Sequence, residues 1–348
     1  MALFNECIYE ILTFLAPKEL LLCYLLNSNF NNLCASESLW KQFVDSKHKE
    51  VLREKTYYES FQICYQIYNL NNIFKMHSIR NNCEKYFVIL EPEVIRHYYT
   101  IEIFSCCHFK VEHPFINIPT EFRMLSNLKK FVFRNEDIKI IPVEICRLTN
   151  LTYLDLTDNC IETLPSEIKN LTNLTDLYLN NNKLTELPSE IGHMTNLQIL
   201  HMNWNKLKTL PEEIGLLKKL TELDISHNDL YQLPKTIGLL KNLKTVDASV
   251  NSLRSIPDEI GNLHNLECLY LGFNQLEELP HNLTNLKKLI VLYLNHNKLN
   301  VISTELLDLP QLPVICYIGN NMEPDILDNL GKLIREKCAN SVKLPIQC

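Results

Sequence analysis

The chain has 348 residues, which is enough for two or three domains. Its formal net charge of −7 and pI near 5.9, without a continuous basic stripe, argue against nucleic-acid binding. The leucine-rich run 20–26 is too short to span a bilayer, and the N-terminal residues lack the pattern of a secretory signal. The thirteen cysteines include no CxxC pair, so we expect a protein of the cytoplasm or nucleus, or of a host cell's cytoplasm if its source is viral.

Residues 1–45 are predicted to form a small all-α domain. Apolar residues recur there at helical spacing, at Ile8, Ile11, Leu12 and Leu15. Pro17 is placed to open a second helix, where its missing N–H costs nothing. A segment of this size is too small to bury a large core, so part of its apolar surface is expected to need a partner.

The order of residues in this segment resembles an F-box, through which substrate receptors of cullin–RING ubiquitin ligases bind the Skp adaptor. The matching positions are Leu3, Glu6, Ile11, Leu12, Leu15, Pro17, Glu19, Leu20, Leu21, Leu39, Trp40 and Lys41. Phe4 and Phe30 stand where the family pattern has proline and tryptophan. The resemblance implies adaptor binding by Leu3, Phe4, Glu6, Ile11, Leu12, Pro17, Leu20, Leu21 and Trp40. The alternative interpretation is a plain helical cap on the rest of the chain.

Residues 46–98 are predicted to be a helical linker, and residues 99–124 an N-terminal cap repeat. Aromatic residues line one face of the linker at helical spacing, including Tyr57, Phe61, Tyr65 and Tyr68. In the cap, the cluster Cys106, Cys107, His108 and His113 invites a test for zinc. Because adjacent cysteines point to opposite faces of a strand, we interpret the cluster as cap core and expect neither a metal nor a cofactor.

Residues 125–322 repeat with a period of 23 residues. Eight of the fifteen prolines keep this interval: Pro119, Pro142, Pro165, Pro188, Pro211, Pro234, Pro257 and Pro280. In the copy 148–170, Leu154 and Leu156 alternate with polar residues, which predicts a strand with one buried face. The Leu164-Pro165 pair ends the extended structure, and one short helical turn is expected after it. A fixed period of this length indicates stacked supersecondary units.

An asparagine follows each predicted strand, at Asn159, Asn182, Asn205, Asn228, Asn251, Asn274, Asn297 and Asn320. Its side-chain amide is expected to hydrogen-bond backbone groups of its own turn and the next one, because a buried amide left unpaired is costly. The pattern LxxLxxLxLxxNxLxxLPxxIxx resembles leucine-rich repeats of the 23-residue form, similar to intracellular Ras-group repeat proteins. The resemblance implies an α/β fold, a solenoid with a concave parallel sheet that follows the small all-α domain. Residues 323–348 are predicted to be a C-terminal cap helix and tail.

Two columns of variable residues are predicted to lie on the concave face. One contains Asp155, Tyr178, His201, Asp224, Asp247, Tyr270 and Tyr293, and its neighbour contains Asp158, Asn181, Trp204, His227, Val250, Phe273 and His296. Large aromatic residues on an exposed face are typical of interface hot spots. The predicted partner-binding residues are therefore Tyr178, His201, Trp204, Tyr270, Phe273 and Tyr293. The acidic residues among them predict a protein partner with apolar anchors and some basic residues, although tyrosines are also tolerated singly on a solvated sheet.

The pattern of titratable residues contains no nucleophile–base motif and no glycine-rich phosphate loop, so we expect a protein that is not an enzyme. The two resemblances together imply the substrate-recognition subunit of a cullin–RING ubiquitin ligase. Its partners would be the Skp adaptor with the ligase core and a target protein, with no nucleic acid and no membrane. The alternative is a scaffold for intracellular signalling that does not act in ubiquitination.

Overall fold

The computed structural model describes residues 103–107, 126–135, 137–310 and 313–339. The chain divides into two compact units, and all of the described residues belong to the second, which comprises residues 102–120 and 126–348. The F-box-like segment 1–45, with its predicted adaptor-binding residues, and the linker 46–98 lie outside the described residues. His108 and His113 of the cap cluster lie outside them as well.

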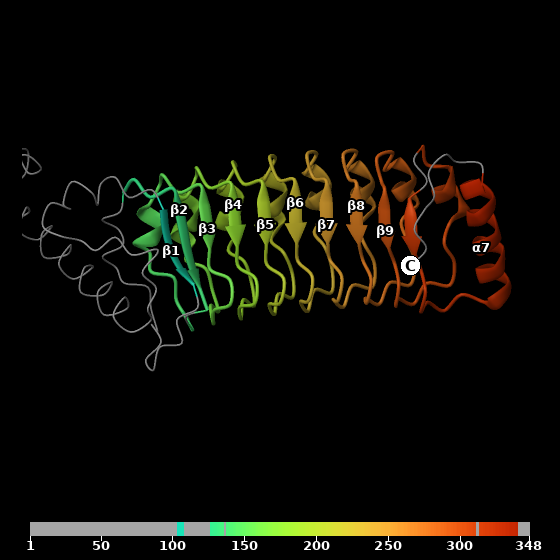
Figure 1. Cartoon of the computed structure of the whole chain (residues 1–348), viewed down its shortest axis with the longest axis horizontal. Helices are drawn as coiled ribbons and strands as arrows, with labels where there is room; N and C mark the ends of the chain where they lie inside the picture. The colour runs from blue at the N-terminus through green and yellow to red at the C-terminus, as the bar shows by residue number, and fades with distance from the viewer. Residues whose placement is uncertain (1–102, 108–125, 136, 311–312, 340–348) are drawn as a thin grey trace, which may run out of the picture. The chain divides into compact units, whose positions relative to one another are not determined.

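The strands form one ten-stranded sheet in which each strand pairs in parallel with the next along the chain. They lie side by side in chain order (Figure 1). Their bounds are β1 Ile103–Cys107, β2 Lys130–Arg134, β3 Tyr153–Asp155, β4 Asp176–Tyr178, β5 Ile199–His201, β6 Glu222–Asp224, β7 Thr245–Asp247, β8 Cys268–Tyr270, β9 Val291–Tyr293 and β10 Val314–Cys316. From β2 onward, residues 23 apart are register partners, as Leu154 and Leu177 are, so the sequence period is also the spacing of the sheet. The predicted parallel sheet is confirmed.

A short 3-10 helix follows each strand from β2 to β9, at the place where the sequence predicts a helical turn. Their bounds are η3 Ile145–Arg147, η4 Ser166–Asn170, η5 Ser189–His193, η6 Glu212–Leu216, η7 Lys235–Leu239, η8 Asp258–Asn262, η9 His281–Asn285 and η10 Thr304–Asp308. Proline immediately precedes most of these helices in an extended conformation, with φ of −69° at Pro165. The turns pack so closely that a Cβ added to Gly238 would lie 2.3 Å from the backbone oxygen of Glu259. Only glycine fits such a contact.

The core lies between the sheet and the 3-10 helices. The central residue of each strand from β3 to β9 points into it and is fully buried, as at Leu154, Leu200 and Leu223. The isoleucine of each 3-10 helix from η3 to η8, such as Ile168, is buried against the same core, and leucine takes its place in η9 and η10. Burying one such side chain contributes about 1.5–3 kcal/mol, so the stack is stabilised by many equivalent layers. Past the last strand, α7 (Pro324–Ala339) packs on η10 and buries Leu330.

The recurring asparagines form the predicted ladder of buried amides, with one correction. Asn228 Oδ1 accepts a hydrogen bond from Leu207 N at 2.9 Å, and its Nδ2 donates to the carbonyls of Met202, Ile225 and Ser226 at 3.0–3.1 Å. The same pattern recurs from Asn159 to Asn320. The neighbouring turn that each amide bridges is the preceding one, not the next one as predicted. Each amide therefore joins its own layer to the preceding layer.

Asn228→Ala is expected to lower the free energy of unfolding by about 2–4 kcal/mol. The substitution leaves the Leu207 N–H and two or more carbonyls without their partner in a buried site, and each lost partner is costly. Urea denaturation of the full chain measures the change. The matched control is Asn242→Ala, because the exposed Asn242 side chain donates only one hydrogen bond, to Lys218 O at 2.8 Å. Equal losses from both substitutions would contradict a stabilising role of the ladder.

Candidate protein-binding surface

The first and third residues of each strand from β3 to β9 point away from the core, because side chains alternate along a strand. We call the surface they form the strand face. Its first column contains Tyr153, Asp176, Ile199, Glu222, Thr245, Cys268 and Val291, and its third contains Asp155, Tyr178, His201, Asp224, Asp247, Tyr270 and Tyr293. Most of these side chains are half-buried by their neighbours in adjacent strands. The predicted binding residues Tyr178, His201, Tyr270 and Tyr293 lie on this face.

The residue immediately before each ladder asparagine lies in a turn rather than on the sheet. These residues are Asp158, Asn181, Trp204, His227, Val250, Phe273, His296 and Gly319, and together with Asn135, which precedes Glu136 in the equivalent position, we call them the turn row. Every member has a positive φ, between 51° and 76°. The sequence prediction places this set in a column beside that of Asp155 on the concave face, and the structure places it in the turns that follow strands of only three residues.

The turn row carries large side chains in the backbone conformation that favours glycine, asparagine and aspartate. Trp204 and Phe273 remain 57% and 52% exposed. The ring of Trp204 stacks on that of His227 at a centroid distance of 3.8 Å, and Phe273 stacks on His296 at 4.4 Å. Neither histidine is among the predicted binding residues. Each histidine follows its aromatic partner by 23 residues, which is one repeat, and this spacing could have identified both histidines from the sequence.

The aromatic side chains of the strand face also meet in pairs. Tyr270 and Tyr293 make an edge contact at 5.1 Å, and so do Tyr178 and His201. Tyr153, which is not among the predicted binding residues, lies 5.2 Å from Tyr178. Among the predicted binding residues, the structure thus pairs Tyr178 with His201 and Tyr270 with Tyr293, and it joins Trp204 and Phe273 to histidines of the next repeat.

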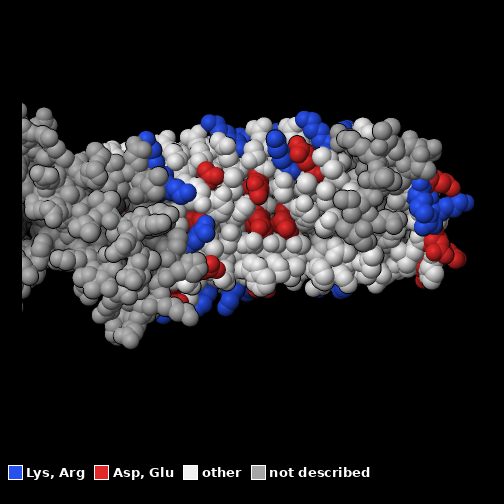
Figure 2. Space-filling view, in the orientation of Figure 1, with Lys and Arg blue, Asp and Glu red and all other residues white. Residues whose placement is uncertain are grey.

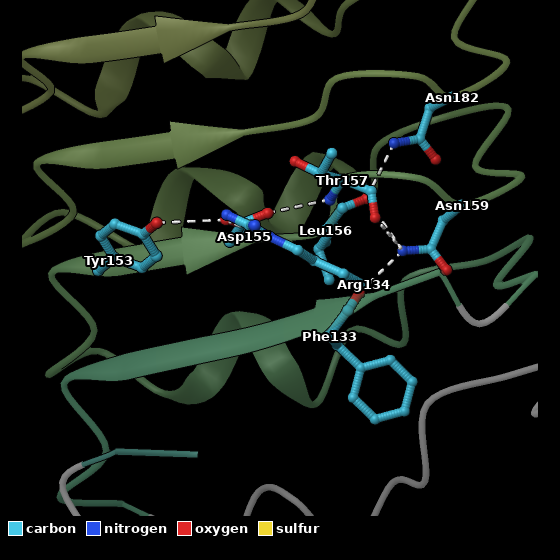
Figure 3. A network of polar contacts seen from close by, with 8 residues as sticks. All are labelled: Phe133, Arg134, Tyr153, Asp155, Leu156, Thr157, Asn159 and Asn182. Atoms are coloured by element: carbon cyan, nitrogen blue, oxygen red, sulfur yellow. Dashed lines mark hydrogen bonds and ion pairs between the residues drawn. The ribbon is translucent and has the colours of Figure 1, made fainter. Parts of the chain in front are cut away.

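Asp155 is fully buried, although its column was predicted to place it among the exposed acidic residues of the concave face. Its carboxylate accepts hydrogen bonds from Arg134 Nε at 2.8 Å, from Arg134 Nη2, and from Thr157 N at 3.1 Å. The Tyr153 hydroxyl donates to the same carboxylate at 3.2 Å (Figure 3). Burial, followed by the charge of Asp155, raises the pKa of Tyr153 to about 12, which keeps this donor protonated. The guanidinium of Arg134 therefore neutralises Asp155 within the chain.

Asp224 and Asp247 occupy the same column as Asp155, and they are register partners on β6 and β7. Figure 2 shows acidic side chains gathered near the middle of the row of strands. Asp224 accepts hydrogen bonds from Ser226 N and Oγ and from Asn203 Nδ2, and Asp247 accepts them from Ser249 N and Oγ. Among the described residues, neither carboxylate forms an ion pair. The two negative charges therefore face each other without a cation.

Burial raises the pKa of Asp247, and the neighbouring charge of Asp224 adds to this effect. Hydrogen bonds from Ser249 and the proximity of His227 act in the opposite direction, but they do not cancel it. Keeping Asp247 ionised in the folded chain therefore costs free energy. A nearby cation would lower that cost, so the site favours the approach of a cation.

Val250→Asn is expected to raise the free energy of unfolding by about 1 kcal/mol, because a β-branched residue in the left-handed region is strained and asparagine is not. Val250 has a φ of 54°, and Asn181 occupies the equivalent position with a φ of 51°. The reverse substitution, Asn181→Val, serves as the control and is expected to lower the stability of the chain. Chemical denaturation measures both. A Val250→Asn variant less stable than wild type would contradict the strain assigned to the turn row.

Asp247→Asn is expected to leave the full chain at least as stable as wild type at pH 7. Because the folded-state pKa lies above the ordinary value of 3.8, the folded chain binds more protons than the unfolded chain between the two values. The contribution of the Asp247 carboxyl to the free energy of unfolding therefore falls as pH rises through that window. The asparagine variant has no titrating carboxyl at this position, so it does not show this decrease. Thermal denaturation against pH measures the difference.

Asp155→Asn, which removes the charge paired with Arg134, is the contrasting control and is expected to destabilise the chain. Destabilisation at neutral pH by Asp247→Asn as large as that by Asp155→Asn would contradict this account.

Residues 132–209 match the family model described as a leucine-rich repeat region, and residues 218–276 match a leucine rich repeat model. A search of curated proteins returned no match. In the part of the chain that the structure describes, no helix is long and apolar enough to cross a membrane. No cluster of three or more histidine, cysteine or acidic side chains that could hold a metal ion was found in that part either.

Solved structures share the fold. The ectodomain of the plant membrane receptor kinase GASSHO1/SCHENGEN3 from Arabidopsis thaliana is 30% identical over 59% of this chain and 26% of its own, with a TM-score of 0.54. The plant peptide hormone receptor RGFR1 is 29% identical over 59% of this chain and 34% of its own, with the same TM-score of 0.54. An internalin from Listeria monocytogenes is 22% identical over 62% of this chain and 69% of its own, with a TM-score of 0.52, and that likeness shows the fold alone. The chain thus spans about a third or less of the length of the two plant receptors.

The family models, the 23-residue register and the asparagine ladder agree on one assignment. This chain contains a region of leucine-rich repeats, whose stacked parallel strands form a protein-interaction domain.

Proposed function

We propose that this chain is the substrate-recognition subunit of a cullin–RING ubiquitin ligase. In this proposal the leucine-rich repeats bind a target protein, and the F-box-like segment 1–45 binds the Skp adaptor. The observation that carries the proposal is the presence, in one chain, of an F-box-like sequence and a repeat surface with exposed aromatic anchors at Trp204 and Phe273. Ligases of this class act in the cytoplasm and nucleus, and we expect the chain there.

The chemistry of the repeats supports a binding role rather than a catalytic one. The thiol of Cys146 is buried, and its pKa is raised to about 12 by burial and, to a smaller extent, by the charges of Glu167 and Glu144. Such a thiol is not a nucleophile at neutral pH. In this proposal the chain is not itself an enzyme. It accelerates ubiquitin transfer by holding the target close to the enzyme that carries ubiquitin.

The two plant structures support polypeptide binding by such repeats. The GASSHO1/SCHENGEN3 ectodomain is in complex with CASPARIAN STRIP INTEGRITY FACTOR 2, and RGFR1 is in complex with RGF2. In this chain, exposed aromatic residues and an uncompensated pair of acidic residues lie on and beside one face of the sheet. Those are the features of a surface that a polypeptide covers.

The second candidate function is a signalling scaffold that binds a protein through the repeats and has no contact with the adaptor. The similarity of the repeat sequence to Ras-group repeat proteins favours it. The two candidates differ in a single property, which is whether the N-terminal segment binds the Skp adaptor.

The full chain is expected to retain purified Skp adaptor in a pull-down, and Leu20→Asp with Leu21→Asp is expected to reduce the retained adaptor at least about tenfold. A tenfold decrease in binding corresponds to about 1.4 kcal/mol, and two charges buried in an apolar interface cost well over that amount. The matched control is Leu216→Asp with Leu239→Asp, which places the same substitutions at leucines of the 3-10 helices that are 47% and 46% exposed. Adaptor binding that is absent in wild type, or equal in the two variants, would rule out the ligase role and favour the scaffold.

A further inference from the structure

We propose that the strand face and the turn row together bind an extended segment of a partner protein, in which an arginine or lysine lies between two large apolar residues. Each apolar residue is two positions from the basic one, so the motif is apolar–x–basic–x–apolar. The inference rests on the proposed function only in that the repeats bind a polypeptide, and it holds equally for a ligase substrate or for the partner of a scaffold.

The spacing of the motif follows from the spacing of the repeats. Trp204 and Phe273 follow β5 and β8, so they are three repeats apart. Parallel strands lie about 4.8 Å apart, which separates the two anchors by about 14 Å. An extended chain advances about 3.3 Å per residue and presents every second side chain to the same side. Residues four apart in such a chain span about 13 Å, so their side chains can meet Trp204 and Phe273 together.

The bulky side chains in the middle of the turn row indicate that the repeats carrying them are adapted for binding. Its first members are Asn135, Asp158 and Asn181, and its last is Gly319, all residue types that tolerate a positive φ. Bulky or β-branched residues occupy the whole interval between them, at Trp204, His227, Val250, Phe273 and His296. Backbone strain of this kind persists where the side chains serve a function. The histidine rings stacked behind Trp204 and Phe273 restrict both aromatic side chains before a partner arrives.

The charge of the central residue follows from a comparison within the chain. At Asp155, the guanidinium that covers the carboxylate comes from Arg134, which lies 21 residues earlier. The equivalent position for Asp224 is Asn203, and for Asp247 it is Ser226. Both are short and uncharged, so among the described residues no side chain does for Asp224 or Asp247 what Arg134 does for Asp155. A guanidinium or ammonium group from the partner would complete the arrangement that the chain already contains at Asp155.

The acidic pair lies on β6 and β7, the two strands between those that precede Trp204 and Phe273. A basic side chain midway between two apolar anchors is therefore directed toward Asp224 and Asp247. The same charges disfavour a phosphorylated or acidic segment, which would add a third negative charge to an uncompensated pair. Tyr270 and Tyr293, in edge contact on the strand face, extend the apolar surface beyond the second anchor.

The test is a selection of phage-displayed random 12-residue peptides on the immobilised full chain. We expect enrichment of peptides with an arginine or lysine flanked at both second positions by large apolar residues. The enriched consensus is then synthesised with a fluorescein label, and its binding is measured by fluorescence anisotropy. Replacing its basic residue by glutamine is expected to weaken binding at least about tenfold.

Substitutions in the chain locate the site. Asp224→Asn with Asp247→Asn is expected to weaken binding of the consensus peptide about tenfold or more and to remove its advantage over the glutamine peptide. Trp204→Asn and Phe273→Asn, which place a residue suited to a positive φ in the turn row, are each expected to weaken it by a similar factor. The matched controls are Asp258→Asn and Tyr231→Asn, at exposed positions outside the strand face and the turn row, and they are expected to bind as wild type does. Circular dichroism verifies that each variant is folded.

The inference is overturned if no peptide is enriched, if the enriched peptides lack a basic residue, or if the aspartate variants bind the consensus as wild type does. Enrichment of acidic or phosphate-mimicking sequences would also overturn it. A pull-down of Skp adaptor by the same preparation keeps the two proposals separate. Peptide selection without adaptor binding contradicts the ligase role alone, and adaptor binding without the expected peptides contradicts this inference alone.

Discussion

Each ladder asparagine joins two layers of the solenoid through one amide group. At Asn182 the side chain accepts from Ile161 N and donates to the carbonyls of Leu156 and Leu179, so it connects its own turn to the preceding one. Most of the strands have only three residues, and so few ladder bonds alone hold a sheet weakly. The amides add buried hydrogen bonds at the point where each strand ends, and they fix the 23-residue register in which the leucines stack. The rest of the architecture depends on this bridge.

The ladder also explains why the turn row can carry strained residues. Each member of the row from Asp158 onward immediately precedes a ladder asparagine, as Trp204 precedes Asn205 and Phe273 precedes Asn274. The backbone N–H of Trp204 donates to Ser226 O in the next repeat, and its carbonyl accepts from Asn182 N in the preceding one, so the turn is held on both sides. A turn fixed in this way tolerates a bulky side chain in the left-handed region at a cost of about 1–2 kcal/mol. The constant framework thereby displays variable side chains in fixed positions.

The repeated framework could be predicted from sequence because its signals are local and recur every 23 residues. Leu154, Asn159 and Pro165 each carry a physical role that the period makes visible, and the strand, the ladder and the 3-10 turn follow from them. The display surface could be predicted only in part. The positive φ of Trp204 depends on where a three-residue strand stops, and element boundaries are the least certain part of any such prediction. The neutralisation of Asp155 by Arg134 depends on a contact between adjacent repeats, which the composition of the column does not reveal.

Hydrogen exchange of the backbone amides in the full chain tests the role of the ladder most directly. The decisive amides are those that donate to ladder oxygens within the array, at Ile161, Leu184, Leu207, Leu230, Leu253 and Leu276. If the ladder holds the layers together, these amides exchange slowly and at similar rates, because they open only when neighbouring repeats open together. Rapid exchange at these positions, while the strand amides stay protected, would contradict the account.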